Sequence, residues 1–591
     1  MHVYKSRYAC PPLPATSIFD FLLGEGSRAA SVGLERAALI DGMTGEKVTY
    51  SALRQFSLHL ANSLSALCTS LSTSTILLLS RSSIHFPPVV LAASAARLSV
   101  SLADPAATVY ELVVQLKASG AGVVVVEADE VMVQKAVEAA RRAGLRGEER
   151  VVVIPCAVRG KGMTAEEVRS KGLQDLNDLT QGENSFEPVT LTEEQAKTDL
   201  AYMPWSGGLG GAPKLTHISP YNVTSQLIQI AQTTGIFNPG DVKLSALPMA
   251  YALGSFIELF ISLHLGGTLV IYPSFDLKTI LAGVEKYCAQ TLVLVGPLVP
   301  LFIHDLLLEK YDLSSLRWIG CGGSPVPSSA QRALTRRLTS LRSRSSTPGG
   351  PVESLFFFQA GGMTECTALA FLPSLEEGRD PMSDGTVGGL VAGMEARVVA
   401  GESGARRRGE GRDVGKGEEG ELWLRGASVS KGYVRDSLAS NDAFPSDGWL
   451  RTGDLVKVSP GGVFTYTGRL KPIIKNKGLQ ANPVQIEGLI YSTGLVEDCV
   501  VVGVWNSKFF TELPRAYVVA KQPAVLPPAE LAAFVKTTVK KHLSPQKWFA
   551  GGVELVEAIP RRKDGSLDAA SLSRKKQGKV EEERKEIRSH L

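Results

Sequence analysis

A glycine-rich segment carries the clearest phosphate-binding chemistry in the chain. It reads Tyr202-Met-Pro-Trp-Ser206-Gly-Gly-Leu-Gly-Gly-Ala-Pro-Lys214, with four glycines in five positions. Uncovered backbone N–H groups in such a loop can surround phosphate oxygens, and Lys214 adds a positive charge. Pro-Lys in place of Gly-Lys separates the segment from the GxxxxGK[ST] phosphate loop. A flexible glycine-rich loop without a ligand is the alternative interpretation.

A second segment, Gln359-Ala-Gly-Gly-Met-Thr-Glu365, places a hydroxyl and a carboxylate next to each other. A carboxylate is a hard oxygen ligand that suits Mg²⁺ beside phosphates. Thr364 and Glu365 would equally suit the first turn of a helix. Taken alone, the segment therefore predicts either a metal ligand or the start of a helix.

Two later segments supply an acidic acceptor and a run of basic residues. They read Gly448-Trp-Leu-Arg-Thr-Gly-Asp-Leu455 and Gly468-Arg-Leu-Lys-Pro-Ile-Ile-Lys-Asn-Lys-Gly-Leu-Gln-Ala-Asn-Pro483. An ionised Asp454 would make strong hydrogen bonds to hydroxyl groups. A lone Thr-Gly-Asp is usually a turn, and a lone basic run is a solvated strand.

In register, the four segments resemble the adenylate-forming (AMP-binding) enzymes, in particular the acyl-CoA synthetases and 4-coumarate–CoA ligases. The corresponding family patterns are Y-S-S-G-T-T-G-x-P-K, Q-G-Y-G-M-T-E, G-W-x-x-T-G-D and G-R-x-K-[DE]-x-I-K-x-x-G-x-Q. Further matching blocks, such as Leu247-Pro-Met-Ala-Tyr-Ala-Leu-Gly254, extend the resemblance over nearly the whole chain. It implies a ligase that uses ATP, Mg²⁺ and CoA to activate an aryl or a medium- or long-chain carboxylic acid.

The resemblance also implies roles for individual residues. The implied catalytic residues are Lys214, Thr364, Glu365, Arg469, Lys475 and Gln480. The implied ATP- or AMP-binding residues are Ser206, Gly207, Gly208, Gly210, Gly211, Gln359, Ala360, Gly361, Met363, Thr364, Asp454 and Arg469. The implied acyl pocket contains Tyr251, Ser255, Gly322, Gly323 and Ala360. Glu365 would hold Mg²⁺, Lys477 and Gly478 would border the CoA thiol path, and Lys471 would be the interdomain hinge.

Several residues depart from the family patterns. Leu209 and Gly210 replace two threonines, Gly361 replaces a tyrosine and Tyr251 replaces a common histidine. Ser566 stands where the family has a lysine that helps to drive adenylation. Loss of one such charged donor costs roughly 10²–10³ in rate.

The departures leave two alternatives to an active CoA ligase. One is a catalytically impaired nucleotide-binding homologue. The other is an adenylation enzyme that delivers acyl groups to a separate carrier protein. The chain ends soon after residue 580 without a carrier or reductase domain, which favours free CoA as the acceptor.

The elements that must position these residues form an α/β pattern. A length of 591 residues predicts two or more domains. Helical and buried-strand patterns alternate, which predicts parallel or mixed sheets covered by helices. The predicted helices span residues 53–67, 109–117 and 277–287, and the predicted strands span residues 75–79, 123–126, 269–272 and 291–295.

A domain boundary is expected near Gly468 because a new set of elements starts there. Strands are predicted at residues 498–502, 516–520 and near 553, with a helix over 528–541. We therefore expect a large domain over 1–468 and a small, mobile α+β domain over 469–591. Polar or glycine-rich composition predicts loops or insertions at residues 159–190, 341–352 and 401–419.

Composition limits the partners and the compartment. A net charge of +4 gives no basis for nucleic-acid binding, and no apolar run is long enough for a transmembrane helix. Seven scattered cysteines without CxxC spacing indicate reduced thiols in an intracellular protein. The final Ser589-His590-Leu591 is a variant of the peroxisomal S-K-L signal. We expect a peroxisomal import receptor as partner and a peroxisomal location, with the cytoplasm as alternative.

Overall fold

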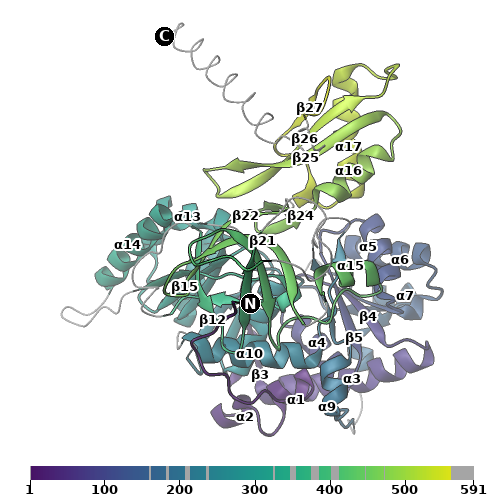
Figure 1. Cartoon of the computed structure of the whole chain (residues 1–591). Helices are drawn as coiled ribbons and strands as arrows, with labels where there is room; N and C mark the ends of the chain where they lie inside the picture. The colour runs from purple at the N-terminus through teal and green to yellow at the C-terminus, as the bar shows by residue number, and fades with distance from the viewer. Residues whose placement is uncertain are drawn as a thin grey trace.

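The computed structural model is a mixed α/β protein with a large N-terminal part and a small C-terminal domain (Figure 1). This confirms the predicted fold class. The structure describes residues 2–158, 162–180, 186–206, 213–234, 238–245, 247–323, 326–345, 355–374, 385–400, 412–445, 448–470 and 473–560.

One parallel sheet of the N-terminal part has the strand order β8-β7-β6-β4-β5-β9. Its strands are β4 (Thr75–Leu79), β5 (Ser99–Ala103), β6 (Val123–Glu127), β7 (Val151–Ile154), β8 (Gln174–Asp175) and β9 (Tyr202–Met203). Every residue of β4, β5 and β6 is buried, as expected where helices cover both faces. The neighbouring helices are α3 (Tyr50–Ser70), α4 (Phe86–Ala95), α5 (Val109–Ser119) and α6 (Glu130–Ala143).

A second sheet has the order β16-β15-β14-β12-β13-β2-β3 and is parallel except for β3. Its strands are β2 (Ala37–Asp41), β3 (Lys47–Thr49), β12 (Val242–Ser245), β13 (Thr268–Ile271), β14 (Thr291–Val295), β15 (Trp318–Gly322) and β16 (Phe356–Gln359). Its helices include α10 (Pro220–Thr234), a π-helix η2 (Leu253–Phe260), α11 (Ile261–His264), α12 (Leu277–Tyr287), α13 (Val299–His304) and α14 (Ser328–Ser345). Shorter helices are α1 (Ile18–Leu23), α2 (Arg28–Val32) and α9 (Glu193–Thr198).

A third sheet has antiparallel pairs throughout, in the order β1-β19-β20-β21-β22-β18-β17. A short turn at residues 459–463 joins the neighbouring strands β21 and β22, which suits antiparallel pairing. Its strands are β1 (Tyr4–Lys5), β17 (Phe371–Leu372), β18 (Thr386–Leu390), β19 (Glu395–Val399), β20 (Gly420–Arg425), β21 (Leu450–Val458) and β22 (Phe464–Arg469), and α15 (Ser437–Ala443) lies between β20 and β21 in the chain.

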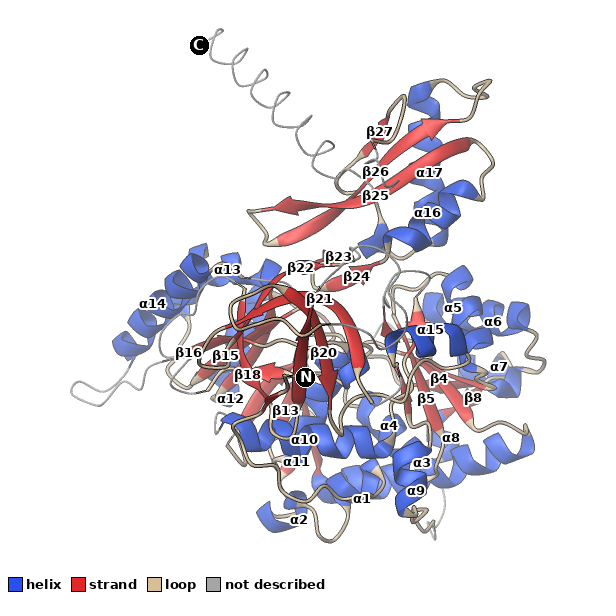
Figure 2. Ribbon diagram, viewed as in Figure 1, coloured by secondary structure: helices blue, strands red, loops and turns tan. Residues whose placement is uncertain are grey.

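The small domain lies above these sheets in the view of Figures 1 and 2. It has its own apolar core, which begins at Ile474. Its elements are β23 (Ile474–Asn476), β24 (Leu479–Ala481), α16 (Pro483–Tyr491), β25 (Val496–Asn506), β26 (Thr511–Ala520), α17 (Pro528–His542) and β27 (Val553–Leu555). The predicted strands at 498–502 and 516–520 lie within β25 and β26.

One predicted insertion is partly wrong. Residues 162–180, inside the expected loop at 159–190, form α7 (Ala165–Ser170), β8 and α8 (Leu176–Leu179). Thr164 caps α7, and Val168 and Leu176 are buried, so local apolar contacts stabilise a segment whose composition is polar. The loop at 341–352 begins inside α14, and its remainder and most of 401–419 lie outside the described residues.

All seven cysteines are free thiols. In the part of the chain that the structure describes, none of the helices combines the length and apolarity that a membrane span requires.

Candidate active site

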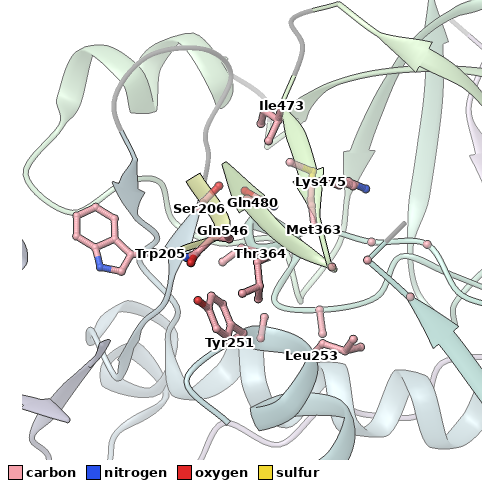
Figure 3. Close-up of a pocket in the computed structure, with 18 of the residues that line it drawn as sticks. Trp205, Ser206, Tyr251, Leu253, Met363, Thr364, Ile473, Lys475, Gln480 and Gln546 are labelled. Atoms are coloured by element: carbon pink, nitrogen blue, oxygen red, sulfur yellow. The ribbon is translucent and has the colours of Figure 1, made fainter. Parts of the chain in front are cut away.

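A cavity of about 820 Å³ lies between the N-terminal sheets and the small domain. Most of the predicted site residues line it, and several are drawn in Figure 3. These residues are Ser206, Tyr251, Gly322, Gly323, Gln359, Ala360, Gly361, Met363, Thr364, Asp454, Arg469, Lys475, Gly478 and Gln480. Gly207, Gly208, Gly210, Gly211 and Lys471 lie outside the described residues.

A short hairpin holds the two ends of the glycine-rich segment. Strand β10 (Trp205–Ser206) pairs with β11 (Lys214–Leu215), so that Ser206 lies opposite Lys214. The Lys214 ammonium lies 5.0 Å from the centre of the Tyr433 ring. Lys214 does not line the cavity itself, and this cation–π contact holds its charge next to the base of the loop.

The Glu365 carboxylate is buried and held by two hydroxyl groups. Ser206 Oγ and the Tyr433 hydroxyl both donate to Glu365 Oε1, the latter over 2.7 Å. Burial and the charge of Glu365 raise the pKa of Tyr433, so this phenol stays a donor. Among the described residues, none donates a hydrogen bond to Oε2. A single oriented carboxylate oxygen fits Mg²⁺, which usually keeps several of its water ligands.

Strand register brings Asp454 and Arg469 together. The two residues are cross-strand partners on β21 and β22 and form an ion pair between Arg469 Nε and Asp454 Oδ1. Asp454 is only 5% exposed, and its backbone amide donates to the Thr452 hydroxyl over 3.1 Å. Within the described ranges no donor reaches Asp454 Oδ2, so this oxygen is open to a ligand in the cavity.

An aromatic ring lies beside Gly361. A Cβ at residue 361 would lie 3.1 Å from the Tyr466 ring and 3.0 Å from Val387. Burial and the charge of Asp454 raise the pKa of Tyr466, so its hydroxyl stays neutral. Gly361 stands where the family pattern has a tyrosine, and in the structure the Tyr466 ring lies against that position.

The opposite part of the cavity has apolar walls. Trp318 and Phe358 lie on the neighbouring strands β15 and β16, with ring centres 5.3 Å apart. Leu253 and Ile257 of the π-helix η2 line the same cavity. Ser255, predicted to belong to the acyl pocket, is fully buried and does not line it; its hydroxyl donates to the Tyr251 carbonyl over 3.0 Å.

The β23–β24 hairpin of the small domain closes the cavity from above. Gly478 has φ +80°, and its Cα would lie 3.3 Å from a Cβ at Gly323. Two glycines therefore allow the hairpin backbone to approach the end of β15. Burial and the nearby Arg469 charge lower the pKa of Lys475, which lines the cavity. Lys477 is exposed and does not line it.

Comparison with known proteins assigns the family. Residues 27–434 match the AMP-binding enzyme family, and residues 485–565 match the C-terminal domain of AMP-binding enzymes. The chain belongs to the AMP-binding enzyme family. This confirms the resemblance on which the predicted site residues depend.

Curated relatives of this AMP-binding enzyme include CoA ligases. It is 27% identical to the Peroxisomal OPC-8:0-CoA ligase 1 of Arabidopsis thaliana, over 94% of this chain and 92% of that protein. It is 28% identical to the Probable 4-coumarate–CoA ligase 3 of Dictyostelium discoideum, over 71% of each chain. The family implies the use of ATP and CoA.

Solved structures share the fold. An amide bond synthetase from Marinactinospora thermotolerans superimposes with a TM-score of 0.73 at 22% identity, covering 92% of this chain and 98% of that one. An o-succinylbenzoate CoA synthetase from Bacillus subtilis gives 0.69 at 21% identity, covering 93% and 97%.

For several residues at the site of this AMP-binding enzyme, the sequence predicts no role. They are Asp104, Trp318, Tyr433, Tyr466 and Gln546. Tyr433 belongs to the Lys431-Gly-Tyr433 segment, which follows the Gly420–Gly426 block and could have indicated a role. The others lie in no motif, and only the fold brings them to the cavity.

Proposed function

We propose that this AMP-binding enzyme is an AMP-forming acid–thiol ligase. The acid carboxylate attacks the α-phosphorus of ATP, and pyrophosphate leaves. The thiolate of CoA then attacks the acyl carbonyl of the resulting acyl-adenylate, and AMP leaves. The observation that carries the proposal is the convergence of the Asp454–Arg469 pair and the Lys475 hairpin on one cavity. Glu365 lines a smaller pocket that shares Arg469 and Gln480 with this cavity.

The nucleotide would lie against the Tyr466 side of the cavity. Asp454 would accept hydrogen bonds from the ribose hydroxyls, and the Tyr466 ring would supply the aromatic face for the base. Thr364, the glycine-rich loop and Lys214 would hold the phosphates. Mg²⁺ bound through Glu365 would neutralise charge on the phosphate oxygens. The protein contributes mainly positioning and charge neutralisation to phosphoryl chemistry of this kind.

The acyl group would lie between η2 and the rings of Trp318 and Phe358. The walls there are apolar, and Gly320 lies between the two rings. Relatives named for 4-coumarate and OPC-8:0 support an aryl or a medium- or long-chain acid. Tyr251 would border the carboxyl end of this pocket.

The small domain would serve the second half-reaction. Lys475 and Gln480 point to this role because the hairpin that carries them lines the cavity. CoA would approach beside Lys477 and the Gly478–Gly323 contact. We place the division between a domain over 1–468 and a domain over 469–591 at the hinge Lys471.

An impaired homologue is the second candidate. Leu209 and Gly210 remove two hydroxyl donors, and Ser566 removes a positive charge that would stabilise the developing charge on the α-phosphate. Transfer to a separate carrier protein is a variant of the ligase proposal with a different thiol.

One experiment separates these functions. The purified enzyme is incubated with Mg·ATP and a panel of cinnamic acids and C8–C16 fatty acids, with and without CoA. We expect pyrophosphate release and an acyl-CoA product by mass spectrometry for at least one acid. ATP binding without pyrophosphate release would support the impaired homologue, and release without an acyl-CoA product would support a carrier-protein acceptor.

We also propose a peroxisomal location through Ser589-His590-Leu591 and an import receptor. The peroxisomal name of the Arabidopsis relative supports it. A fluorescent fusion should be peroxisomal with the last three residues and cytoplasmic without them. The same distribution for both fusions would contradict the proposal.

A further inference from the structure

The small domain contacts the N-terminal part through residues 542–547, here called the lid loop, which run from the last residue of α17 through a short 3-10 helix at Pro545–Lys547. Thr108 Oγ1 donates to the His542 carbonyl over 2.7 Å. Ser544 Oγ and Lys547 Nζ both donate to Glu111 Oε1, over 3.1 and 2.6 Å. The Lys547 and Glu111 side chains are only 12% and 11% exposed, so this ion pair is shielded from solvent.

A separate contact of the lid loop reaches the acyl side of the cavity through Asp104. Asp104 directly follows β5, and its Oδ1 accepts the Ala106 N–H over 2.8 Å. Its other oxygen, Oδ2, accepts two hydrogen bonds, from the Tyr251 hydroxyl over 2.6 Å and from Gln546 Nε2 over 2.9 Å. One oriented carboxylate oxygen thus joins a side chain of the small domain to a side chain of the acyl pocket. Figure 3 shows the two residues that it joins, Gln546 and Tyr251.

Tyr251 is well placed to transmit this contact. Its carbonyl accepts from the Ser255 amide and hydroxyl, both over 3.0 Å, at the start of the π-helix η2. Leu253 and Ile257 of that helix line the cavity. Burial and the charge of Asp104 raise the pKa of Tyr251, so its hydroxyl remains protonated and donates. A π-helix is a strained element that often lies at functional sites.

The other end of the contact reaches the hairpin that carries Lys475. Asn476 Nδ2, on β23, donates to the Gln546 carbonyl over 2.8 Å. Hydrogen bonds therefore run without interruption from the hairpin, through Gln546 and Asp104, to Tyr251.

We propose that Asp104 is a positioning residue that couples docking of the small domain to the orientation of Tyr251 at the acyl pocket. With the small domain docked, Gln546 and the Ala106 amide hold the carboxylate, and the carboxylate holds the Tyr251 ring. When the small domain leaves, Asp104 loses Gln546, and the Tyr251 ring gains freedom to move. The contact itself is independent of the proposed function, whereas its consequence for turnover rests on it.

Two variants of neighbouring lid-loop residues test the coupling. Gln546→Leu removes the bond to Asp104 and leaves the Glu111 contacts in place. Lys547→Met removes the Glu111 ion pair and leaves the Asp104 contact in place. Hydrogen–deuterium exchange of the full chain follows two peptides, one at residues 248–260 and one at residues 108–116.

A crossed pattern is expected. Gln546→Leu should speed exchange at 251–255 about fivefold, the change expected for one lost hydrogen bond, and leave 108–116 unchanged. Lys547→Met should speed exchange at 108–116 and leave exchange at 251–255 unchanged. Asp104→Asn should change the exchange rates in the same way as Gln546→Leu. In protein that already carries Tyr251→Phe, adding Gln546→Leu should not change exchange at 251–255 further.

Two results would overturn the coupling. One is unchanged exchange at 251–255 in folded Gln546→Leu protein, and the other is the same effect of both lid-loop variants at that peptide. The measurement needs no acid substrate and no turnover. A protein without activity on the acid panel would therefore contradict the proposed function, and its hydrogen–deuterium exchange would still test the coupling through Asp104.

Discussion

The proposed nucleotide side and the small-domain side of the cavity are built by different means. On the proposed nucleotide side, strand pairing places Lys214 opposite Ser206 and Asp454 opposite Arg469. On the small-domain side, side-chain hydrogen bonds from the lid loop and one contact between two glycines position the hairpin of Lys475.

The difference separates a preorganised region from a movable one. Charged side chains that strand register already holds in place need little reorganisation when charge develops in the transition state. Such preorganisation favours electrostatic stabilisation of the transition state. Hydrogen bonds between domains can break and form again in each cycle, since each contributes only about 1 kcal/mol net. The comparison predicts that changes on the proposed nucleotide side impair the first half-reaction, and that changes in the lid loop or the β23–β24 hairpin impair the second.

The largest effect is expected for Glu365→Gln. The carboxamide keeps the size of the side chain and loses the charge that would hold Mg²⁺. ATP–pyrophosphate exchange should fall roughly 10²–10³-fold. Glu497→Gln, an exposed carboxylate of β25, is the matched control and should have no effect. Undiminished exchange in Glu365→Gln would show that the nucleotide side is assigned to the wrong residues.

A gain of activity is expected for Ser566→Lys. The new ammonium group would restore a positive charge for the developing charge on the α-phosphate, and pyrophosphate release should rise by about 10²-fold. Neighbouring Lys563 already carries a charge, so Ser566→Gln serves as the control for side-chain length alone. An unchanged or slower rate of pyrophosphate release would mean that the missing lysine does not limit the first half-reaction. The proposed nucleotide side would then need no charge from the small domain.

A smaller, selective loss is expected for Gly478→Ala. The new Cβ would lie 2.8 Å from Val295, and φ +80° is unfavourable for alanine, so the hairpin could not approach β15 as closely. Thioester formation should fall about tenfold while pyrophosphate exchange stays near the wild-type rate. In Gly488→Ala, on helix α16, the added methyl meets no atom within 4 Å, and both half-reactions should be unchanged. Equal losses in both half-reactions for Gly478→Ala would remove the distinction between the two sides.

The site residues that the sequence indicates lie in short, continuous motifs, both on the proposed nucleotide side (Glu365, Asp454 and Arg469) and on the small-domain hairpin (Lys475 and Gln480). The resemblance of these motifs to a family, and not their spacing alone, singles the residues out. Most segments with strong periodicity are also predictable, such as α12 and β14, whose predicted bounds match the structure.

The rest depends on contacts between segments far apart in the chain. Asp104 and Gln546 are 442 residues apart, and neither belongs to a pattern that indicates a contact. Tyr466 lies against Gly361 only because β22 pairs with β18 beside the 360–363 segment. The helices at 165–179 form because a few buried apolar residues outweigh a polar composition.

The smallest expected effect comes from a residue on neither side. His264, at the end of α11, stacks on Phe21 with ring centres 4.9 Å apart. Burial and the charge of Arg28 lower the pKa of His264 from 6.5 to about 4. Between these values the unfolded chain binds more protons than the folded one, so the free energy of unfolding decreases as the pH falls from about 6.5 towards 4.

His264→Phe keeps an aromatic ring against Phe21 and removes the titrating group. Allowing for solvent screening, the wild-type protein should lose about 1 kcal/mol more stability than the variant between pH 7 and pH 5. Urea unfolding of the domain that contains α11 checks this, and parallel pH dependences of the two proteins would contradict the assignment. Both half-reactions at pH 7 should be the same in the two proteins. Because His264 lies outside both halves of the cavity, an effect on either half-reaction would mean that losses in the other variants also reflect general destabilisation.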